Sequence, residues 1–323
     1  MAAGIATGAE PLDVLFIRGA DRSGGFLEAG NDTARTEQLA DINNNQTFGG
    51  NHGWGELNTL LSSNGFNVSQ VIEPLLGGDP PTGPTQGGPL NFTNPGGANY
   101  VDLGAYDAVV FGSNNAAYGS AAADAVEAYV RGGGGAIFIS DANFGGSWRD
   151  ASDSDQPFLS RFGLTANQDR GTYSRDRADG EFLVPDHPIL EDVDSFDGEG
   201  VTPITVDTVL PAGVDIDILA AAQGLVRRNT APFGTDEQGP SSSATALDAV
   251  LLAGTVDDGR IVGHFDRNTF FNLNGAGTNI NRLDNEQLAL NIFTFAAVPE
   301  PASVLLVGVG VLALAVRRRG AMR

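Results

Sequence analysis

Two patterns of apolar residues alternate along the chain. The first is a short unbroken apolar run flanked by Gly or polar residues, which is typical of a strand buried on both faces of a parallel sheet. The second places apolar residues three or four positions apart, which predicts amphipathic helices. Runs of the first kind predict strands at 13–18, 66–73, 106–112, 136–140 and 259–265. Patterns of the second kind predict helices at 54–61, 120–131, 155–162 and 284–297, with Ser120 as an N-cap.

This alternation predicts an α/β fold with a doubly wound, mostly parallel sheet of the flavodoxin-like kind. We expect one such domain over residues 12–297. Weaker β-like segments between about 165 and 250 predict a β-rich insertion or an antiparallel extension of the sheet. A polar, Gly- and Asn-rich stretch at 22–50 and a Pro- and Gly-rich stretch at 76–97 are long enough to suggest loops that cover a binding site.

The C-terminus carries a tripartite pattern within residues 298–323. It consists of Pro299, Glu300 and Pro301, an uncharged apolar run over 302–316, and the cationic group Arg317, Arg318 and Arg319. The 15-residue run predicts a short transmembrane helix, below the roughly 20 residues usual for one. Its cationic end is expected to stay on the cytoplasmic side, which places the body of the protein outside the cytoplasm.

This tail resembles the PEP-CTERM sorting signal of Gram-negative bacteria. The resemblance implies export, transient anchoring in the inner membrane, and processing near Pro299–Pro301 by an exosortase, followed by a cell-surface or extracellular location. Proteins with this signal also carry an N-terminal signal peptide, yet residues 1–11 contain neither a basic nor an apolar segment of that kind. We therefore expect 1–11 to be a signal-peptide remnant or a disordered leader, with the true start upstream.

Charge and cysteine content narrow the possible functions. The 323 residues contain 40 acidic residues and 18 Arg, a net charge of −22, and no Lys. Without 299–323, which holds four Arg and one Glu, the charge is −25. So acidic a body repels phosphate backbones, which argues against nucleic-acid binding. The absence of Cys excludes disulfides, zinc–thiolate sites, iron–sulfur clusters and a Cys nucleophile.

Several short motifs resemble the class I glutamine amidotransferase-like superfold, in particular its ThuA-like branch. They are Asp-Val-Leu-Phe-Ile-Arg-Gly at 13–19, Tyr-Asp-Ala-Val-Val-Phe at 106–111, Gly-Gly-Gly-Gly-Ala-Ile-Phe-Ile-Ser-Asp at 132–141, Asp-His-Pro-Ile at 186–189 and Gly-Arg-Ile-Val-Gly-His-Phe-Asp at 259–266. The resemblance implies an α/β domain with its site at the strand ends. Amidotransferases place a nucleophilic Cys after the Gly-preceded strand, so this chain cannot hydrolyse glutamine by that route.

Candidate site residues lie after the predicted strands. Ser140 or Asp141 could replace the nucleophile and Asn143 could bind a ligand, although the Gly-x-Ser-x-Gly elbow is absent. His264 and Asp266 stand where amidotransferases carry a His-x-Glu pair, and could form a base and its partner. The alternative for all of them is a capping, ligand-binding or structural role at the carboxyl edge of the sheet.

Other polar residues suggest binding without catalysis. His52 and Trp54 lie at the start of a predicted helix, where an anionic group or a sugar ring could bind. Acidic stretches at 150–155 and 192–197 contain oxygen ligands suited to calcium, although neither matches the EF-hand pattern and solvated acidic loops are the usual alternative. No other cofactor is expected.

Three functions remain open. The first is an exported surface or extracellular-matrix protein whose non-catalytic domain binds an exopolysaccharide, another surface glycan or a different polar ligand. The second is an extracellular carbohydrate-active hydrolase that uses Asp141, His264 and Asp266. The third is a calcium-dependent adhesion module. The missing Cys favours the first of these over an enzyme.

Overall fold

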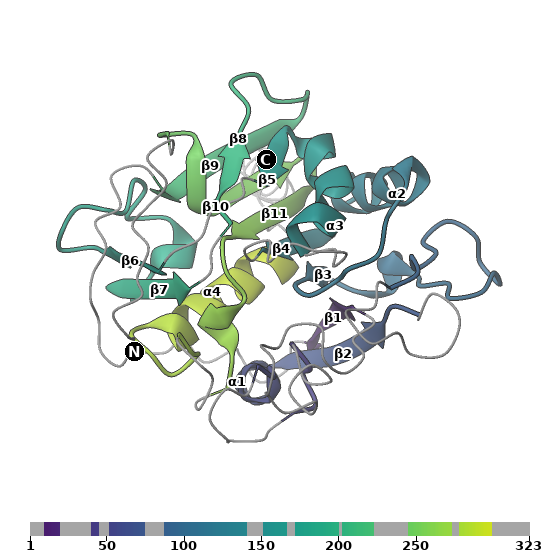
Figure 1. Cartoon of the computed structure of the whole chain (residues 1–323), viewed down its shortest axis with the longest axis horizontal. Coiled ribbons are helices and arrows are strands. Elements are labelled where there is room, and N and C mark those ends of the chain that lie inside the picture. Colours follow the sequence, from purple (N-terminus) through teal and green to yellow (C-terminus); the bar gives the residue numbers. More distant parts are fainter. Residues whose placement is uncertain are drawn as a thin grey trace, which may run out of the picture.

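The computed structural model describes residues 10–19, 40–44, 52–74, 87–140, 151–166, 172–199, 202–222, 245–272 and 278–298. Within these residues, the main sheet has the strand order β2-β1-β3-β4-β11-β10-β8-β5, and β9 also pairs with β10 (Figure 1). The result is a mixed α/β fold, and its centre is the parallel sheet that the apolar runs predict.

Five strands make up the parallel part of the sheet. They are β1 (Leu12–Arg18), β2 (Phe66–Ile72), β3 (Ala108–Phe111), β4 (Gly135–Ile139) and β11 (Gly259–His264). All four pairings among them are parallel. The side chains of β3 and β4 are buried throughout, which explains why these strands appear as unbroken apolar runs.

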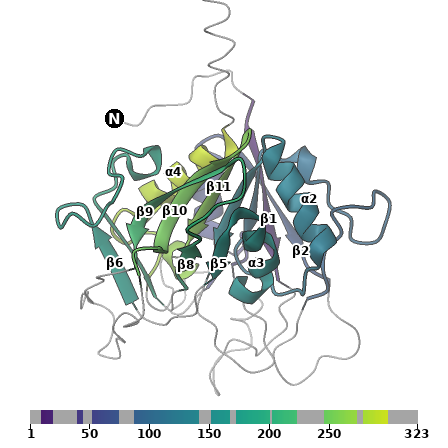
Figure 2. The same ribbon diagram turned by 90° about the horizontal axis from the view of Figure 1, so that it is seen from above.

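Antiparallel strands extend the sheet beyond β11. They are β10 (Asp248–Val256), β8 (Ile204–Val206), β5 (Leu164–Ala166) and β9 (Val214–Ala221). The strands β6 (Thr172–Asp176) and β7 (Ser195–Glu199) form a separate antiparallel pair, and Figure 2 shows β6 at the end of the molecule opposite α2.

Within the described ranges, four α-helices lie on the two faces of the sheet. They are α1 (Gly55–Ser63), α2 (Ser120–Arg131), α3 (Ala151–Leu159) and α4 (Asn285–Ala297). Apolar residues of α1 and α4 share one buried cluster with one face of the sheet, whereas those of α2 and α3 share a second cluster with the other face (Figure 1). The buried apolar side chains of β1, β3 and β4 alternate between the two clusters.

Two helix starts differ from the prediction. The N-cap of α2 is Gly119 rather than Ser120, because the Gly119 carbonyl accepts the N–H groups of Ala122 and Ala123. Helix α3 begins at Ala151, four residues before the predicted start, and a short 3₁₀ turn at Ser160–Phe162 follows it. The apolar periodicity missed its first turn because that turn is polar.

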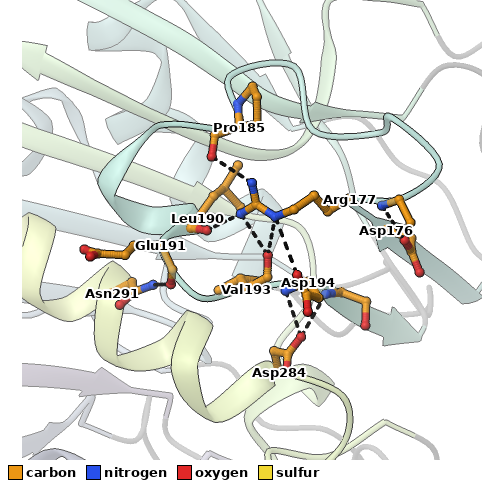
Figure 3. Close-up of polar contacts among 11 residues, drawn as sticks. Asp176, Arg177, Pro185, Leu190, Glu191, Val193, Asp194, Asp284 and Asn291 are labelled. Carbon is orange, nitrogen blue, oxygen red and sulfur yellow. Dashed lines mark hydrogen bonds and ion pairs between the residues drawn. The ribbon is translucent and has the colours of Figure 1, made fainter. Parts of the chain in front are cut away.

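Arg177 organises the loop that joins β6 to β7 (Figure 3). Its guanidinium donates to the carbonyl oxygens of Pro185 at 3.0 Å, Val193 at 2.9 and 3.0 Å, and Leu190. The loop is also attached to α4, because Asp284 accepts the N–H groups of residues 194 and 195, at 2.8 and 2.9 Å. These contacts fix the β6–β7 unit against the main domain.

Among the described helices, none combines the length and the apolar character needed to cross a membrane. The predicted transmembrane segment, 302–316, lies outside the described residues, as do residues 1–9.

Candidate functional site

The carboxyl ends of the parallel strands lie at one edge of the sheet. From β1 the chain passes to β2 on one side, and it then crosses over to β3 on the other side. In doubly wound folds, ligands bind outside the strand ends at such a reversal of strand order. The polar residues that follow β2 and β3 therefore form the first candidate site.

We call Glu73, Asn114, Asn115, Tyr118 and Asp155 the crossover cluster. Glu73 follows β2 and is only 2% exposed. Its Oε1 accepts the Tyr118 hydroxyl at 2.7 Å, and its Oε2 accepts the Asn115 backbone N–H at 2.8 Å. Both carboxylate oxygens thus have a partner within the protein, and Glu73 connects the end of β2 to the segment after β3.

The chain at Gly87 packs directly on this cluster. Its N–H donates to the Asn115 side-chain oxygen at 2.8 Å. A Cβ at Gly87 would lie 2.4 Å from Glu73 Oε2, which no real side chain tolerates. A glycine at position 87 is therefore needed for this close approach.

Asn114 connects β3 to α3. Its Nδ2 donates to Asp155 Oδ1 at 2.6 Å and to Ser154 Oγ at 2.9 Å, and the Ser154 hydroxyl donates to the Ala116 carbonyl at 2.7 Å. Within the described part of the chain, the other oxygens, Asn114 Oδ1 and Asp155 Oδ2, have no hydrogen-bond partner although both are buried. The neighbouring Ser113 hydroxyl oxygen is likewise buried and has no hydrogen-bond partner among the described residues. Such atoms are uncommon in folded proteins, and each calls for an explanation such as a bound water, an ion or a functional role.

Burial determines the protonation of this cluster. Asp155 is fully buried, and this raises its pKa well above the usual value, an effect that the negative charge of Glu73 increases and the Asn114 hydrogen bond opposes. Burial also raises the pKa of Tyr118 well above 10.0, and the Glu73 carboxylate adds to the shift. Asp155 is thereby favoured as a neutral carboxylic acid, which can donate a hydrogen bond.

A second polar group lies at the end of β11. His264 is fully buried among the rings of Phe196, Phe265 and Phe270, with ring centroids 5.0 to 6.2 Å from its own. Its Nδ1 accepts the Asp266 backbone N–H at 3.2 Å, which assigns the ring proton to Nε2. Burial lowers the pKa of His264 to about 3. The imidazole is therefore neutral at physiological pH.

Ser140 and Asp266 lie beside His264 at this edge. The Ser140 N–H donates to the His264 carbonyl at 2.9 Å, and Asp266 Oδ1 accepts the Asn268 N–H at 2.9 Å. Among the described residues, neither Ser140 Oγ nor His264 Nε2 has a hydrogen-bond partner, so no hydrogen bond joins these two side chains. The predicted site residues Asp141 and Asn143 lie outside the described residues.

His52 and Trp54 lie on the side of the sheet covered by α1. Trp54 is 1% exposed, its ring packs edge-on against Phe16 and Phe270, and its Nε1 donates to the Arg267 carbonyl at 3.3 Å. His52 is 8% exposed, and its ring centroid lies 4.7 Å from that of Phe271. Protein atoms cover both rings, and the indole forms part of the core.

One buried carboxylate of each acidic stretch contacts other protein groups. Asp155 bonds to Asn114, and Asp197 forms an ion pair with Arg282 while its Oδ1 accepts the Asn285 side-chain amide at 3.2 Å. No group of three or more His, Asp or Glu side chains with metal-binding geometry occurs within the ranges given above. Asp150 is outside those ranges.

The comparison with protein families confirms that the tail is a sorting signal. Residues 297–319 match the PEP-CTERM protein-sorting motif. This motif implies a protein that is exported across the membrane and processed by an exosortase, as the tripartite pattern predicts. No curated protein matches the chain.

Solved structures show likeness to the fold. The N-terminal domain of mmIFT52 is similar with a TM-score of 0.50 and 10% identity, over 89% of this chain and 99% of that one. A cytoplasmic protein from Salmonella typhimurium has a TM-score of 0.45 and 15% identity, over 88% and 99%. A putative ThuA-like protein from Parabacteroides merdae has a TM-score of 0.41 and 14% identity, over 90% and 91%. ThuA-like proteins are thus among the structural neighbours.

The crossover cluster was missed at the sequence level. Its signal was the polar run 113–115 directly after β3, which is the same kind of signal that singled out 140–143 after β4. Glu73 and Asp155 were overlooked because the apolar patterns place Glu73 inside the predicted strand 66–73 and Asp155 inside the predicted helix 155–162.

Proposed function

We propose that this chain is an exported cell-surface or extracellular-matrix protein whose α/β domain binds a glycan or another polar ligand without catalysing a reaction. The observation that carries the proposal is the pair of buried, unpartnered oxygens, Asn114 Oδ1 and Asp155 Oδ2, at the strand crossover. Each such atom costs roughly 1–3 kcal/mol until a partner satisfies it. A ligand that hydrogen-bonds to both would recover that cost.

The chemistry at the end of β11 supports binding over catalysis. A general base works best when its pKa lies near the operating pH, and a histidine with a pKa of about 3 is a poor one. A serine nucleophile also needs a base within hydrogen-bonding distance, and Ser140 has no hydrogen bond to His264. These two facts weigh against Ser140 as a nucleophile and His264 as its base, whereas Asp141, which the hydrolase alternative combines with His264 and Asp266, lies outside the described residues.

The tail supplies the cellular setting of the proposal. The apolar run 302–316 would hold the exported chain in the inner membrane until an exosortase acts near Pro299–Pro301. The released domain, with its large negative charge, would then remain at the surface or in the matrix. Its ligand would be a surface glycan or exopolysaccharide encountered there.

The test is a binding screen of the full chain against a glycan array and bacterial surface polysaccharides, with Asn114→Leu as the site variant. The control is Asn67→Leu, which changes an exposed asparagine on the edge strand β2. We expect the wild type and the control to bind and Asn114→Leu to lose binding. An absence of binding across the screen, or turnover of a bound glycan, contradicts the proposal.

A further inference from the structure

We infer that the crossover cluster selects an uncharged sugar hydroxyl group, and therefore a neutral carbohydrate over an acidic sugar, an amino sugar or a metal cation. This inference rests on the proposed function, since it names the ligand class of the same site. It follows from which atoms of the cluster have partners and which do not.

Glu73 cannot serve as a ligand-binding carboxylate in this arrangement. Oε1 is bonded to the Tyr118 hydroxyl and Oε2 to the Asn115 backbone N–H. A metal cation such as calcium requires several free oxygen ligands, usually carboxylates. Glu73 is instead a positioning residue that holds the segment after β3 and contributes negative charge to the interior.

The unpartnered atoms form a complementary pair. Asn114 Oδ1 can only accept a hydrogen bond. Asp155 Oδ2 belongs to a carboxyl group that is favoured in its protonated form, and it can therefore donate one. The two groups are joined by the 2.6 Å hydrogen bond between Asn114 Nδ2 and Asp155 Oδ1, so their remaining oxygens belong to adjoining groups. A partner for both must donate one hydrogen bond and accept another.

A hydroxyl group meets this requirement with a single oxygen atom. Its O–H can donate to Asn114 while its lone pair accepts from Asp155, whereas an amide needs two separate atoms for the same task. The adjacent Ser113 hydroxyl, which is also unpartnered among the described residues, can bond to a second hydroxyl of a vicinal pair. Vicinal hydroxyl groups are the defining feature of carbohydrates.

Charge excludes the other sugar classes. A carboxylate on an acidic sugar would meet the negative charge of Glu73 and the net charge of −22 on the whole chain. An ammonium group on an amino sugar can only donate, so it would leave the protonated Asp155 without an acceptor. A neutral hydroxyl avoids both penalties.

The experiment measures the melting temperature and the binding isotherm of the full chain with five probes. These are a neutral glucose oligosaccharide, a galacturonate oligosaccharide, a glucosamine oligosaccharide and calcium chloride, with propionamide as an amide arm. We expect the neutral oligosaccharide to raise the melting temperature and to bind at least tenfold more tightly than any other probe. Asp155→Asn, which keeps a neutral donor, should stay within about threefold of wild type, and Asp155→Leu should lose binding.

The outcomes separate the two proposals. Preferred binding of galacturonate, glucosamine, calcium or propionamide overturns the inference and leaves a polar-ligand function in place. No binding by any probe or glycan overturns both. The comparison among probes uses the wild-type chain, so it decides the inference even where Asp155→Leu does not fold. Asp153→Asn, on the exposed side of α3, serves as the matched control and should bind as wild type does.

Discussion

The side-chain amide of Asn114 donates to the buried carboxyl group of Asp155 across 2.6 Å, although 41 residues separate the two in sequence. The bond joins the end of β3 to α3, and it satisfies one oxygen of an acid that is fully buried. Because burial disfavours the charged form, and because Asp155 Oδ2 has no hydrogen-bond partner among the described residues, ionisation of this acid is unfavourable in the folded state.

Asp155→Asn should stabilise the protein relative to wild type as pH rises. The pKa of Asp155 is raised in the folded state, so the folded state holds more protons than the unfolded state above the unfolded pKa. Its contribution to stability is full below that value and declines as pH rises towards the folded pKa. Urea denaturation at pH 4 and pH 7 measures this. Between pH 4 and pH 7, the free energy of unfolding of the variant should rise relative to that of wild type. The rise is at most about 1.4 kcal/mol for each pH unit between the unfolded and the folded pKa.

Asp153→Asn is the control for this experiment, because it removes an exposed carboxyl group from the same helix. A change in the pH dependence of stability as large in Asp153→Asn as in Asp155→Asn would show that the effect does not come from the buried carboxyl group. Equal pH dependence in Asp155→Asn and wild type would contradict the raised pKa.

The sequence predicted the parallel part of the fold because those strands are buried on both faces. The apolar runs at 13–18 and 136–140 correspond to β1 and β4 with shifts of one residue at their ends. Strands such as β6 and β9 were harder to recognise, since their burial depends on partners distant in sequence. In β9, exposed Asp215 and Asp217 alternate with half-buried apolar residues, and the strand pairs only with β10.

The candidate site was less predictable than the fold. A strand end shows where a site can form, but it does not show which polar residues reach one another from other elements. In the sequence, Asp155 was singled out as a member of an acidic stretch. Its hydrogen-bond partner, the side-chain amide of Asn114, follows β3, which is distant in sequence. The lowered pKa of His264 likewise depends on Phe196, which comes from the β6–β7 unit.

His264→Gln should reduce the loss of stability at acidic pH. The folded pKa of His264 is about 3 against 6.5 in the unfolded chain, so this group's contribution is full above 6.5 and is lost as pH falls towards 3. Between pH 7 and pH 4 that loss amounts to about 3 kcal/mol, an order-of-magnitude figure. The His264→Gln variant lacks this loss of stability because glutamine does not ionise. Denaturant titrations of both proteins at pH 7 and pH 4 measure the difference in their free energies of unfolding.

His187→Gln is the matched comparison, because His187 is only half-buried and its Nδ1 also accepts a backbone N–H, that of Ile189. Its effect on the pH dependence should be smaller. If both variants change the pH dependence equally, the assignment of the effect to the buried imidazole is wrong.

Arg177→Lys should destabilise the β6–β7 unit by about 1–3 kcal/mol, which is typical of lost hydrogen bonds to a charged group. The guanidinium bonds to three carbonyl oxygens at once and also lies over the Phe182 ring, 5.2 Å from its centroid. A lysine keeps the charge but cannot reproduce this planar set of donors. Thermal melting and proteolysis of the 177–194 loop measure the change.

Arg131→Lys provides the control for Arg177. Arg131 forms partly exposed ion pairs with Glu127 at 2.9 Å and Asp257 at 2.6 Å, and such pairs contribute less than about 1 kcal/mol. A loss in Arg131→Lys as large as that in Arg177→Lys would show that the loop contacts are not specifically stabilising.

Gly135→Ala should destabilise the packing of β4 against the end of α4. A Cβ at position 135 would lie 2.2 Å from the Ala296 carbonyl oxygen, so either the strand or the helix would have to shift. Overpacking of this kind costs about 1–3 kcal/mol. Gly104→Ala, where the nearest atom lies at 3.4 Å, should be close to neutral in the same denaturation experiment. Equal losses in the two variants would contradict the steric explanation.

Insertion of a short Gly-Ser linker between Val298 and Pro299 should increase processing at the sorting motif. The motif begins at Ala297, which is 2% exposed in the last turn of α4, and the Val298 N–H still donates to the Thr294 carbonyl at 3.1 Å. Arg260 holds the same turn through a 2.8 Å hydrogen bond to the Phe295 carbonyl. Proteolytic enzymes act most readily on exposed chain away from folded structure, so the last turn of α4 hinders access.

The fraction of processed protein in an exosortase-containing host measures the effect of the linker. The same linker inserted at exposed Gly180 should leave that fraction unchanged. Equal processing of the two insertion variants would show that the packed end of α4 does not limit the reaction.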